Sequence, residues 1–385
     1  MIVQPAIVVN AYNRPAALAR LLNSLQQAVY PAGAHVPLII SIDHGGAAEV
    51  QQLAENFVWP HGPQDIIAQS EHLGLVEHFF ACGDLTQRHK AIVYLEDDLT
   101  VSPVFYAYAA QVFSFYQPDE RVAGCSLFGL WFNGYTQQPF VPLPDGSDVF
   151  FVQVPYTQGL AFTAEQWSRF TTWRRSPLST AMPSVPLHEA WSQFDREDWF
   201  PLLARFVITT DRYFVFPRVS QATGWGDAGT HFAQASHFFQ VPLQRGKQTY
   251  DFKTLDESVA VYDSFFELQP DRLNRLTDQL HSYDYTLDLY GTKSRANLRT
   301  AYVLTSRPCH HPIASFGKTA WPIEMNVIER VPGSEISWGR VADVRWDRTA
   351  QLRLWLSNYE YFARGRLPRL TTVLKLIVAR LLRSL

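Results

Sequence analysis

Three consecutive carboxylates directly after a short apolar run constrain this chain more than any other feature. The run at 92–95 has the composition of a buried β-strand, and Glu96, Asp97 and Asp98 follow it. Neighbouring carboxylates repel one another and resist burial, so they need cations, hydrogen-bond donors or open water. At the carboxyl end of a strand in an α/β sheet, a divalent metal that carries a diphosphate meets this need. A solvated acidic turn explains the cluster equally well.

Strands alternate with helices through the first 120 residues. Apolar runs with the composition of strands lie at 6–10, 36–42, 66–69 and 90–95. Segments with apolar residues at helical spacing lie between and after them, at 16–28, 47–57, 75–85 and 103–116. This alternation predicts a parallel, doubly wound α/β sheet. A loop over the site is expected at 133–147, which is rich in glycine, proline and glutamine.

The pattern changes after about residue 265. A polar amphipathic helix is expected at 270–282, and 301–346 mixes short strands and turns whose order the pattern does not give. The last segment has six basic residues and no acidic one, with apolar residues at helical spacing. Such a helix is either a surface anchor on anionic lipid or an ordinary terminal helix packed on its own domain. The expected domains are therefore 1–265, an accessory region at 266–363, and a basic amphipathic helix at 364–385.

Composition limits the class of protein. The chain has 385 residues, of which 47% are hydrophobic and 14% aromatic, so it can bury a large core. Its net charge of −3 argues against a nucleic-acid partner, since such proteins carry a basic surface. Three cysteines, far apart and odd in number, fit a reducing compartment. No apolar run is long enough to span a membrane and the start lacks the features of a signal peptide, so we expect a cytoplasmic protein.

Six segments occur in one order along roughly residues 5–240. They are 9–15 (Val-Asn-Ala-Tyr-Asn-Arg-Pro), 39–45, 94–105, 159–162, 217–220 and 229–231. Together they resemble the inverting nucleotide-sugar glycosyltransferases of the GT-A fold, in particular eukaryotic N-acetylglucosaminyltransferase I and bacterial family-2-like sugar transferases. The specific part is the Glu-Asp-Asp-Leu block with Pro103 and Phe105. The resemblance implies a Rossmann-like, doubly wound, mostly parallel α/β sheet with a C-terminal α+β or helical extension, and it makes 1–265 the catalytic domain.

The resemblance also implies a nucleotide site at the ends of the first strands. Asp43 would bond the base, Asn10 the nucleoside, and Arg14 would lie near the diphosphate or the base. The loop at 72–75 matches one that follows the third strand of this fold and touches the nucleotide. As structural alternatives, Asp43 is a turn-former before two glycines and Arg14 is a surface charge at a helix start.

A divalent metal, Mn²⁺ or Mg²⁺, is part of the same resemblance. The family pattern gives it to the last carboxylate, Asp98, while Glu96 and Asp97 face the ribose and the sugar. One protein carboxylate is sufficient, because the diphosphate and waters fill the other positions. His231, after a glycine-rich loop, is the second candidate to reach the metal or the diphosphate; the alternative is a structural histidine.

An inverting transfer needs a general base on the acceptor hydroxyl. The family has this carboxylate in an acidic motif flanked by tryptophan, which here implies Asp198, with Glu197 as second and Asp195 as third candidate. Three acids in the first turn of a helix, favoured there by the helix dipole, are the alternative. Trp225 is a candidate to stack on a sugar face or to pack in the core.

The expected function is the transfer of a hexose or N-acetylhexosamine from a nucleotide diphosphate-sugar, with UDP as the nucleotide. The acceptor is a hydroxyl of a glycan or lipid-linked glycan in bacterial surface polysaccharide synthesis, at the inner face of the membrane if the last helix lies there. A sugar nucleotidyltransferase is disfavoured, because the loop at 10–14 has no glycine. A non-catalytic carbohydrate- or nucleotide-binding protein of the same fold is the other rival.

Overall fold

The computed structural model describes residues 3–136, 138–180, 185–227 and 240–347, together with Leu374 and Val378. The chain divides into two compact units. Unit 1 comprises 1–131 and 142–272, and unit 2 comprises 132–141 and the chain from 273 onward. The first part of the loop expected at 133–147 therefore belongs to unit 2. The predicted basic helix at 364–385 lies outside the described residues apart from two positions, and no helix among the described residues is long and apolar enough to cross a membrane.

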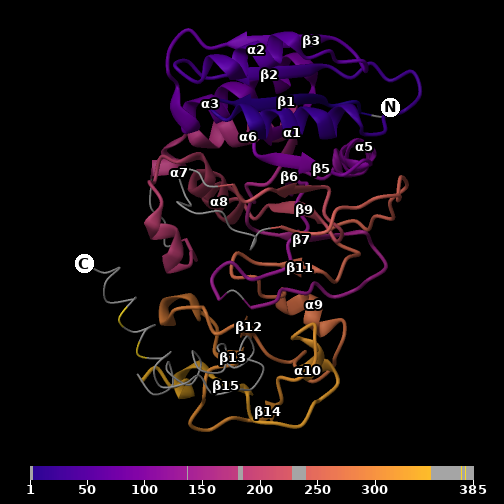
Figure 1. Cartoon of the computed structure of the whole chain (residues 1–385). Coiled ribbons are helices and arrows are strands. Elements are labelled where there is room, and N and C mark those ends of the chain that lie inside the picture. The colour runs from indigo at the N-terminus through magenta and orange to yellow at the C-terminus, as the bar shows by residue number, and fades with distance from the viewer. Residues whose placement is uncertain are drawn as a thin grey trace. The chain divides into compact units, whose positions relative to one another are not determined.

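A nine-stranded sheet forms the centre of unit 1 (Figure 1). Its strands are β1 (Ala6–Ala11), β2 (Leu38–Ile42), β3 (Gln64–Ala68), β4 (Ala91–Glu96), β6 (Val122–Ser126), β7 (Val149–Val152), β8 (Leu160–Thr163), β9 (Tyr213–Pro217) and β11 (Val261–Tyr262). They lie in the order β11-β7-β9-β6-β8-β4-β1-β2-β3. The four strands β3, β2, β1 and β4 are parallel, and β8 is antiparallel to both of its neighbours. The predicted α/β class with a mostly parallel sheet is confirmed.

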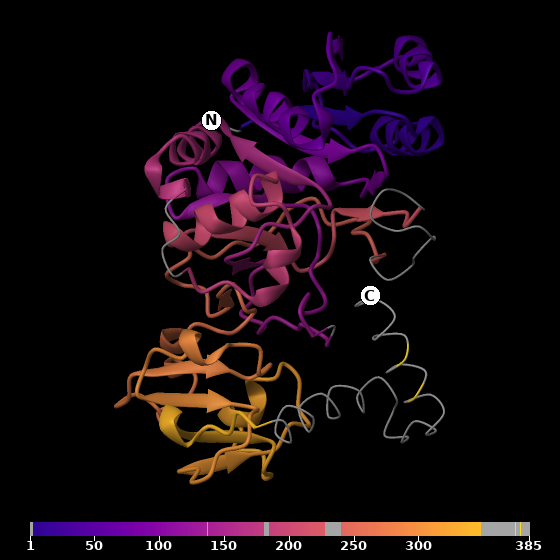
Figure 2. The same cartoon turned by 90° about the vertical axis from the view of Figure 1, so that its left-hand side faces the viewer.

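Helices cover both faces of this sheet (Figures 1 and 2). They are α1 (Pro15–Gln26), α2 (Ala48–Asn56), α3 (Gly74–Asp84), α4 (Thr86–His89), α5 (Phe105–Tyr116), α6 (Ala164–Arg174), α7 (Pro177–Thr180), the 3₁₀ turn η1 (Glu189–Gln193) and α8 (Trp199–Thr209). Helices α1, α2 and α5 share one apolar cluster with alternate strand residues. Helices α3, α6 and α8 meet on the other face through aromatic rings, among them Phe79, Trp167 and Trp199.

The helix α1 shows how sequence determines one of these contacts. Pro15 stands at its first position, where a missing backbone N–H costs nothing. Leu18, Leu21, Leu22 and Leu25 recur at helical spacing and are all buried against the sheet. Each contributes about 1.5–3 kcal/mol of burial free energy, which fixes the helix and so the chain that enters it.

A second, two-stranded sheet joins segments far apart in the sequence. β5 (Leu99–Val101) pairs antiparallel with β10 (Ala222–Gly224), so the residues after the carboxylate triplet lie beside the start of a glycine-rich segment.

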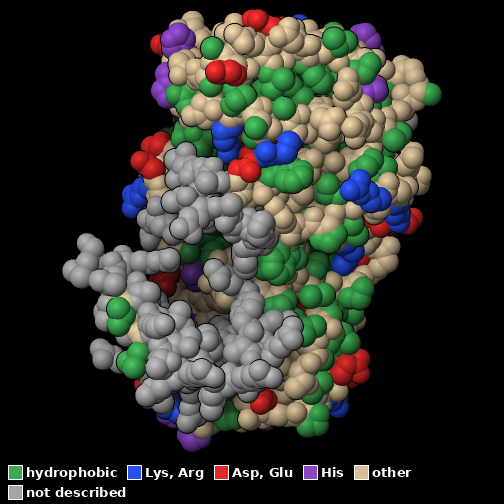
Figure 3. All heavy atoms as spheres, viewed as in Figure 1, with side chains coloured by type: hydrophobic (Ala, Val, Ile, Leu, Met, Phe, Trp, Pro, Cys, Tyr) green, Lys and Arg blue, Asp and Glu red, His purple; other side chains and the backbone are tan. Residues whose placement is uncertain are grey.

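On the face shown in Figure 3, acidic and basic side chains of the described residues are interspersed, without one large patch of either sign.

Unit 2 contains a four-stranded sheet, which includes strands from the segment 301–346, whose order of strands and turns the sequence did not predict. Its strands β12 (Tyr285–Asp288), β13 (Tyr302–Thr305), β14 (Ala314–Phe316) and β15 (Ile336–Arg340) lie in the order β12-β13-β15-β14. The short elements η2 (Arg295–Asn297) and α10 (Met325–Ile328) lie between them along the chain, and η3 (Val341–Asp343) follows β15. The expected helix at 270–282 is wrong beyond Asn274, where α9 (Pro270–Asn274) ends. The His281 ring contacts the carbonyl of Asn274, the last residue of α9. This carbonyl therefore has a side-chain partner in place of the backbone N–H that a longer helix would supply.

Candidate active site

A cavity of about 620 Å³ lies in unit 1 at the carboxyl ends of β1, β2 and β4. The parallel register brings these ends together, because Asn10 lies opposite Glu96 on one side and Ser41 on the other. The residues that line the cavity are Asn10, Ala11, Tyr12, Asn13, Arg14, Asp43, His72, Gly74, Leu75, His78, Glu96, Asp97 and Asp98. The structure thus gathers all the residues predicted for nucleotide binding, and Asp98, around one crevice of the kind in which α/β folds bind ligands.

Arg14 forms ion pairs with two of the three carboxylates. Its Nη2 lies 2.5 Å from Asp97 Oδ1, and its Nη1 lies 2.9 Å from Asp98 Oδ2. The Asp97 side chain is 3% exposed, whereas Asp98 and Arg14 are about one-third exposed on the cavity wall. Arg14 is therefore not the surface charge of the structural alternative; its guanidinium is the one cation that directly contacts the triplet among the described residues.

The third carboxyl of the triplet, Glu96, has a raised pKa. Burial and the repulsion from Asp98 and Asp97 together raise its pKa to about 8, although Arg14 opposes the rise. Burial also raises the pKa of Asp97 to about 6, against the attraction of Arg14. At neutral pH Glu96 therefore holds a proton and can donate a hydrogen bond to a ligand hydroxyl.

Asp43 has a complete set of hydrogen-bond partners. Its Oδ1 accepts from the N–H groups of His44 (2.9 Å) and Leu73 (2.8 Å), and its Oδ2 accepts from Gly74 N–H (2.9 Å). His72 Nδ1 lies 2.9 Å from the same Oδ2. Although burial opposes ionisation, these backbone N–H groups hold the pKa of Asp43 below its usual range. The carboxylate fastens the start of α3 to β2, and a nucleobase N–H would have to replace His72, whose side chain is 57% exposed.

His78 is a lining residue that the sequence pattern did not single out. It is 2% exposed, its Nε2 lies 2.7 Å from Ser41 Oγ, and burial lowers its pKa, so the ring is neutral at pH 7. The signal was a histidine among the apolar residues on the buried side of α3. Asn10 was predicted, but its side chain is also held from below, since Nδ2 donates to the Tyr94 hydroxyl at 2.8 Å.

The rim of the cavity is aromatic and apolar. The rings of Tyr12 and His72 lie with centroids 5.4 Å apart and planes tilted by 35°. Leu75 beside them is 46% exposed. A flat, partly apolar rim opposite a charged wall suits a ligand with a planar ring at one end and anionic groups at the other.

Asp198 is the N-cap of α8. Its Oδ1 accepts from Phe200 N–H at 3.4 Å, which is the contact that the helix-dipole alternative describes. Its negative charge also raises the pKa of Glu96, so Asp198 lies in the electrostatic range of the triplet, although it is not a lining residue of the cavity. Glu197 is exposed, and Asp195 closes the preceding turn by accepting the Glu197 N–H at 3.0 Å.

Trp225 lies beside the triplet through its backbone. Its N–H donates to the carbonyl of Asp98 at 3.2 Å, continuing the pairing of β10 with β5. The indole is 46% exposed, which excludes the core alternative, and the Arg20 guanidinium carbon lies 5.1 Å from its centroid. His231, the second predicted metal ligand, lies outside the described residues.

The carboxylates do not form a closed metal cage. No group of three or more His, Cys, Asp or Glu side chains in the described ranges is arranged to hold a metal ion. The donor set instead fits a hard cation that takes one or two carboxylate oxygens and completes its shell with diphosphate oxygens and water. Asp98, accessible on the cavity wall, is suited to be that ligand, and Mn²⁺ and Mg²⁺ both accept such oxygens.

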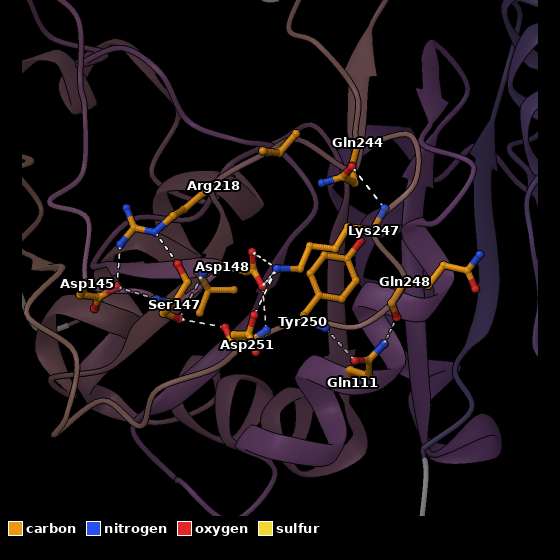
Figure 4. Close-up of polar contacts among 12 residues, drawn as sticks. Gln111, Asp145, Ser147, Asp148, Arg218, Gln244, Lys247, Gln248, Tyr250 and Asp251 are labelled. Carbon is orange, nitrogen blue, oxygen red and sulfur yellow. Dashed lines mark hydrogen bonds and ion pairs between the residues drawn. The ribbon is translucent and has the colours of Figure 1, made fainter.

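Arg218, in one of the segments that carry the resemblance, is not among the lining residues. Figure 4 shows its guanidinium beside Asp145 and Ser147, with 2.9 Å to Asp145 Oδ1 and 2.7 Å to the Ser147 carbonyl. Lys247 pairs with Asp148 next to them at 2.7 Å. These contacts hold the chain that enters β7 against the end of β9, which is a structural role.

No family model and no curated protein matches this chain. Solved structures do. S. aureus TarS 1-349 is 9% identical, with a TM-score of 0.36 over 57% of this chain and 59% of that one. GalNAc-T7 with UDP, GalNAc and Mn²⁺ is 12% identical, with a TM-score of 0.39 over 57% and 43%. The mannosyltransferase PcManGT from Pyrobaculum calidifontis, in complex with GDP-Man and Mn²⁺, is 15% identical, with a TM-score of 0.30 over 43% and 46%.

In each case the match spans less than two thirds of the other chain. At such low identities and TM-scores it assigns no role to any residue, so the roles below are argued from the geometry of the cavity.

Proposed function

We propose that unit 1 is a metal-dependent glycosyltransferase that moves a sugar from a nucleotide diphosphate-sugar to an acceptor hydroxyl. The observation that carries this proposal is one cavity with two different walls. The carboxylates and Arg14 form a charged wall at the end of β4, and Tyr12, His72 and Leu75 form a flat rim over the start of α3. The cavity volume of about 620 Å³ is in the usual range for small-ligand sites.

The donor binds across this cavity in our proposal. The base, uracil in a UDP-sugar, lies at the rim, within reach of Asp43 and the neutral His78. Asn10 and Glu96 face the ribose and the sugar, whose hydroxyl groups both donate and accept hydrogen bonds. The diphosphate lies by Arg14, whose planar guanidinium matches phosphate oxygens in a bidentate manner.

Asp98 is the residue that would hold a divalent metal. A bound Mn²⁺ or Mg²⁺ supplies a Lewis acid that stabilises the charge developing on the leaving diphosphate. Arg14 adds a positively charged donor to the same oxygens, and a positioned donor of this kind contributes about 10²- to 10³-fold to the rate.

Asp198 is the general base of an inverting transfer in this proposal. It removes the proton of the acceptor hydroxyl while the oxygen forms a bond to the anomeric carbon and the bond to the diphosphate breaks on the opposite side. Such assistance contributes about 10²- to 10⁴-fold. What supports the assignment is that the charge of Asp198 acts on Glu96; Glu197 is the second candidate and is more exposed. The exposed indole of Trp225 is available to stack on a sugar face.

The acceptor we propose is a glycan or lipid-linked glycan of a bacterial surface polysaccharide. The basic, amphipathic sequence at 364–385 supports a place at the inner face of the membrane, where anionic lipid attracts such a helix.

Titration calorimetry with UDP, GDP and several of their sugars, with and without Mn²⁺, tests the proposal. We expect metal-dependent binding of one nucleotide class, and slow release of nucleoside diphosphate from its sugar even without an acceptor. Asp98→Ala should lose both, whereas Asp65→Ala, an exposed acid of β3, should keep both. Tight binding without any turnover would favour the non-catalytic rival, and normal turnover by Asp98→Ala would contradict the proposal.

A further inference from the structure

The charges around the triplet are unequal in number. The carboxylates Asp97 and Asp98 meet at the end of β4, and Asp198 adds its negative charge nearby. Arg14 contacts two of them, through two different nitrogens of the same guanidinium. The guanidinium of Arg14 therefore lies where a metal ion would lie if it were bound between Asp97 and Asp98.

Arg14 and a metal ion on Asp98 therefore share the same carboxylate. A cation on Asp98 would take an oxygen of the carboxylate whose Oδ2 already accepts from Arg14 Nη1 at 2.9 Å. Two cations on one partly buried carboxylate repel each other, so metal binding is weakened unless Arg14 has another partner. The diphosphate is such a partner, because it brings several anionic oxygens into the same cavity and suits the guanidinium fork.

Local structure allows this exchange with little movement. Arg14 directly precedes Pro15, whose ring fixes the backbone at the start of α1, and that helix is held by its buried leucines. The side chain itself is 34% exposed and lies on the cavity wall. Rotation about its side-chain torsions is therefore sufficient to move the guanidinium from the carboxylates to a ligand.

We propose that Arg14 is an internal counter-cation, which neutralises Asp97 and Asp98 when the cavity holds no ligand and passes to the diphosphate when metal and nucleotide bind together. This inference rests on the proposed function and extends it: Arg14 couples the two ligands. In the native protein, metal alone binds weakly because it must displace Arg14, and nucleotide strengthens it. By linkage, metal strengthens nucleotide binding by the same factor.

The test is a thermodynamic cycle that needs no turnover. Free Mn²⁺ is measured by electron paramagnetic resonance in titrations of the full chain, with and without UDP, and again with GDP. The variants are Arg14→Gln, Arg14→Lys and, as a control of matched charge, Arg88→Gln, which removes an exposed arginine that pairs with Asp65 outside the cavity. Arg14→Lys keeps the charge but loses the two-nitrogen bridge, and it serves if Arg14→Gln does not fold.

We expect Arg14→Gln to bind Mn²⁺ alone about tenfold more tightly than the native chain, and the strengthening by nucleotide to fall by about the same factor, typical of one coupling interaction. Arg14→Lys should lie between, and Arg88→Gln should match the native chain. An unchanged coupling in Arg14→Gln, with nucleotide still bound, overturns the inference and leaves the proposed function in place. If the native chain binds neither UDP nor GDP at any Mn²⁺ concentration, both this inference and the proposed function are overturned.

Discussion

A carboxyl group in unit 2 gives a stability prediction whose size follows from the structure. Glu324 is the N-cap residue of α10 and is 2% exposed. Its Oε2 has no hydrogen-bond partner in the described part of the chain. Burial raises the pKa of Glu324 from 4.5 to about 7, and a hydrogen bond from its own backbone N–H opposes this only weakly. The folded state therefore binds this proton more tightly than the unfolded chain.

The sign of the pH effect follows from that difference. Between pH 4.5 and 7 the folded state holds more protons than the unfolded state, so raising the pH lowers the free energy of unfolding. Above pH 7 the full cost applies: the rise from 4.5 to about 7 corresponds to about 3 kcal/mol. Glu324→Gln replaces the acid by a neutral side chain of the same shape, and it should remove this dependence.

We expect Glu324→Gln to gain about 3 kcal/mol relative to the native chain between pH 4.5 and pH 8. The free energy of unfolding is measured in urea at both pH values. Hydrogen exchange of the β13 and β15 amides monitors the unfolding, so that the value refers to unit 2 itself. The amide of glutamine adds a constant offset, so the difference between the two pH values is the diagnostic quantity. Glu329→Gln, exposed at the end of the same helix, is the control and should show no such gain. Equal pH dependence of the native chain and Glu324→Gln would refute the argument.

Three further predictions concern unit 1. Asp198→Asn should lower kcat by about 10²- to 10⁴-fold with little change in the KM of the donor, measured in steady state, whereas Glu197→Gln should lose less than tenfold; equal losses would exclude Asp198 as the base. Asp43→Asn should weaken nucleotide binding and lower stability by about 1–3 kcal/mol in urea, because one of its side-chain oxygens becomes a donor facing backbone N–H groups. Arg218→Met should lower stability by about 3 kcal/mol by leaving the buried Asp145 carboxylate without its cation, while nucleotide affinity measured by calorimetry stays within twofold.

The sequence was sufficient to predict how the cavity is assembled, for a physical reason. In a parallel sheet the carboxyl ends of neighbouring strands lie at one edge, so polar residues that follow separate apolar runs must meet there. Asn10, Asp43 and the triplet obeyed this rule. Arg14 followed because Pro15 identified the start of α1, and residues before a helix that follows a strand lie at the same edge.

What the sequence did not give depends on contacts between distant segments. Two of the three backbone N–H groups around Asp43, those of Leu73 and Gly74, come from a loop about thirty residues further along the chain, as does the ring of His72. No local pattern reports such a pairing. The pairing of β5 with β10, which brings Trp225 to Asp98, spans a still longer separation. In unit 2 the strands are three to five residues long and their side-chain alternation is too short to distinguish them from turns.

The helix starts around the cavity explain how so much negative charge is tolerated there. The helix α1 begins directly after the lining residue Arg14, and α3 begins at the lining residue Gly74. A helix N-terminus carries a partial positive charge and free N–H groups, which stabilise anions. The helix α3 also contacts α8, whose N-cap is Asp198, because Phe79 of α3 stacks on Trp199 of α8 with centroids 4.2 Å apart. The same stack that buries apolar surface therefore fixes α8, which Asp198 caps, against α3, whose first N–H group donates to Asp43. For this reason we expect Phe79→Ala to lower kcat in steady state, through the proposed base Asp198, more than it weakens nucleotide binding in calorimetry.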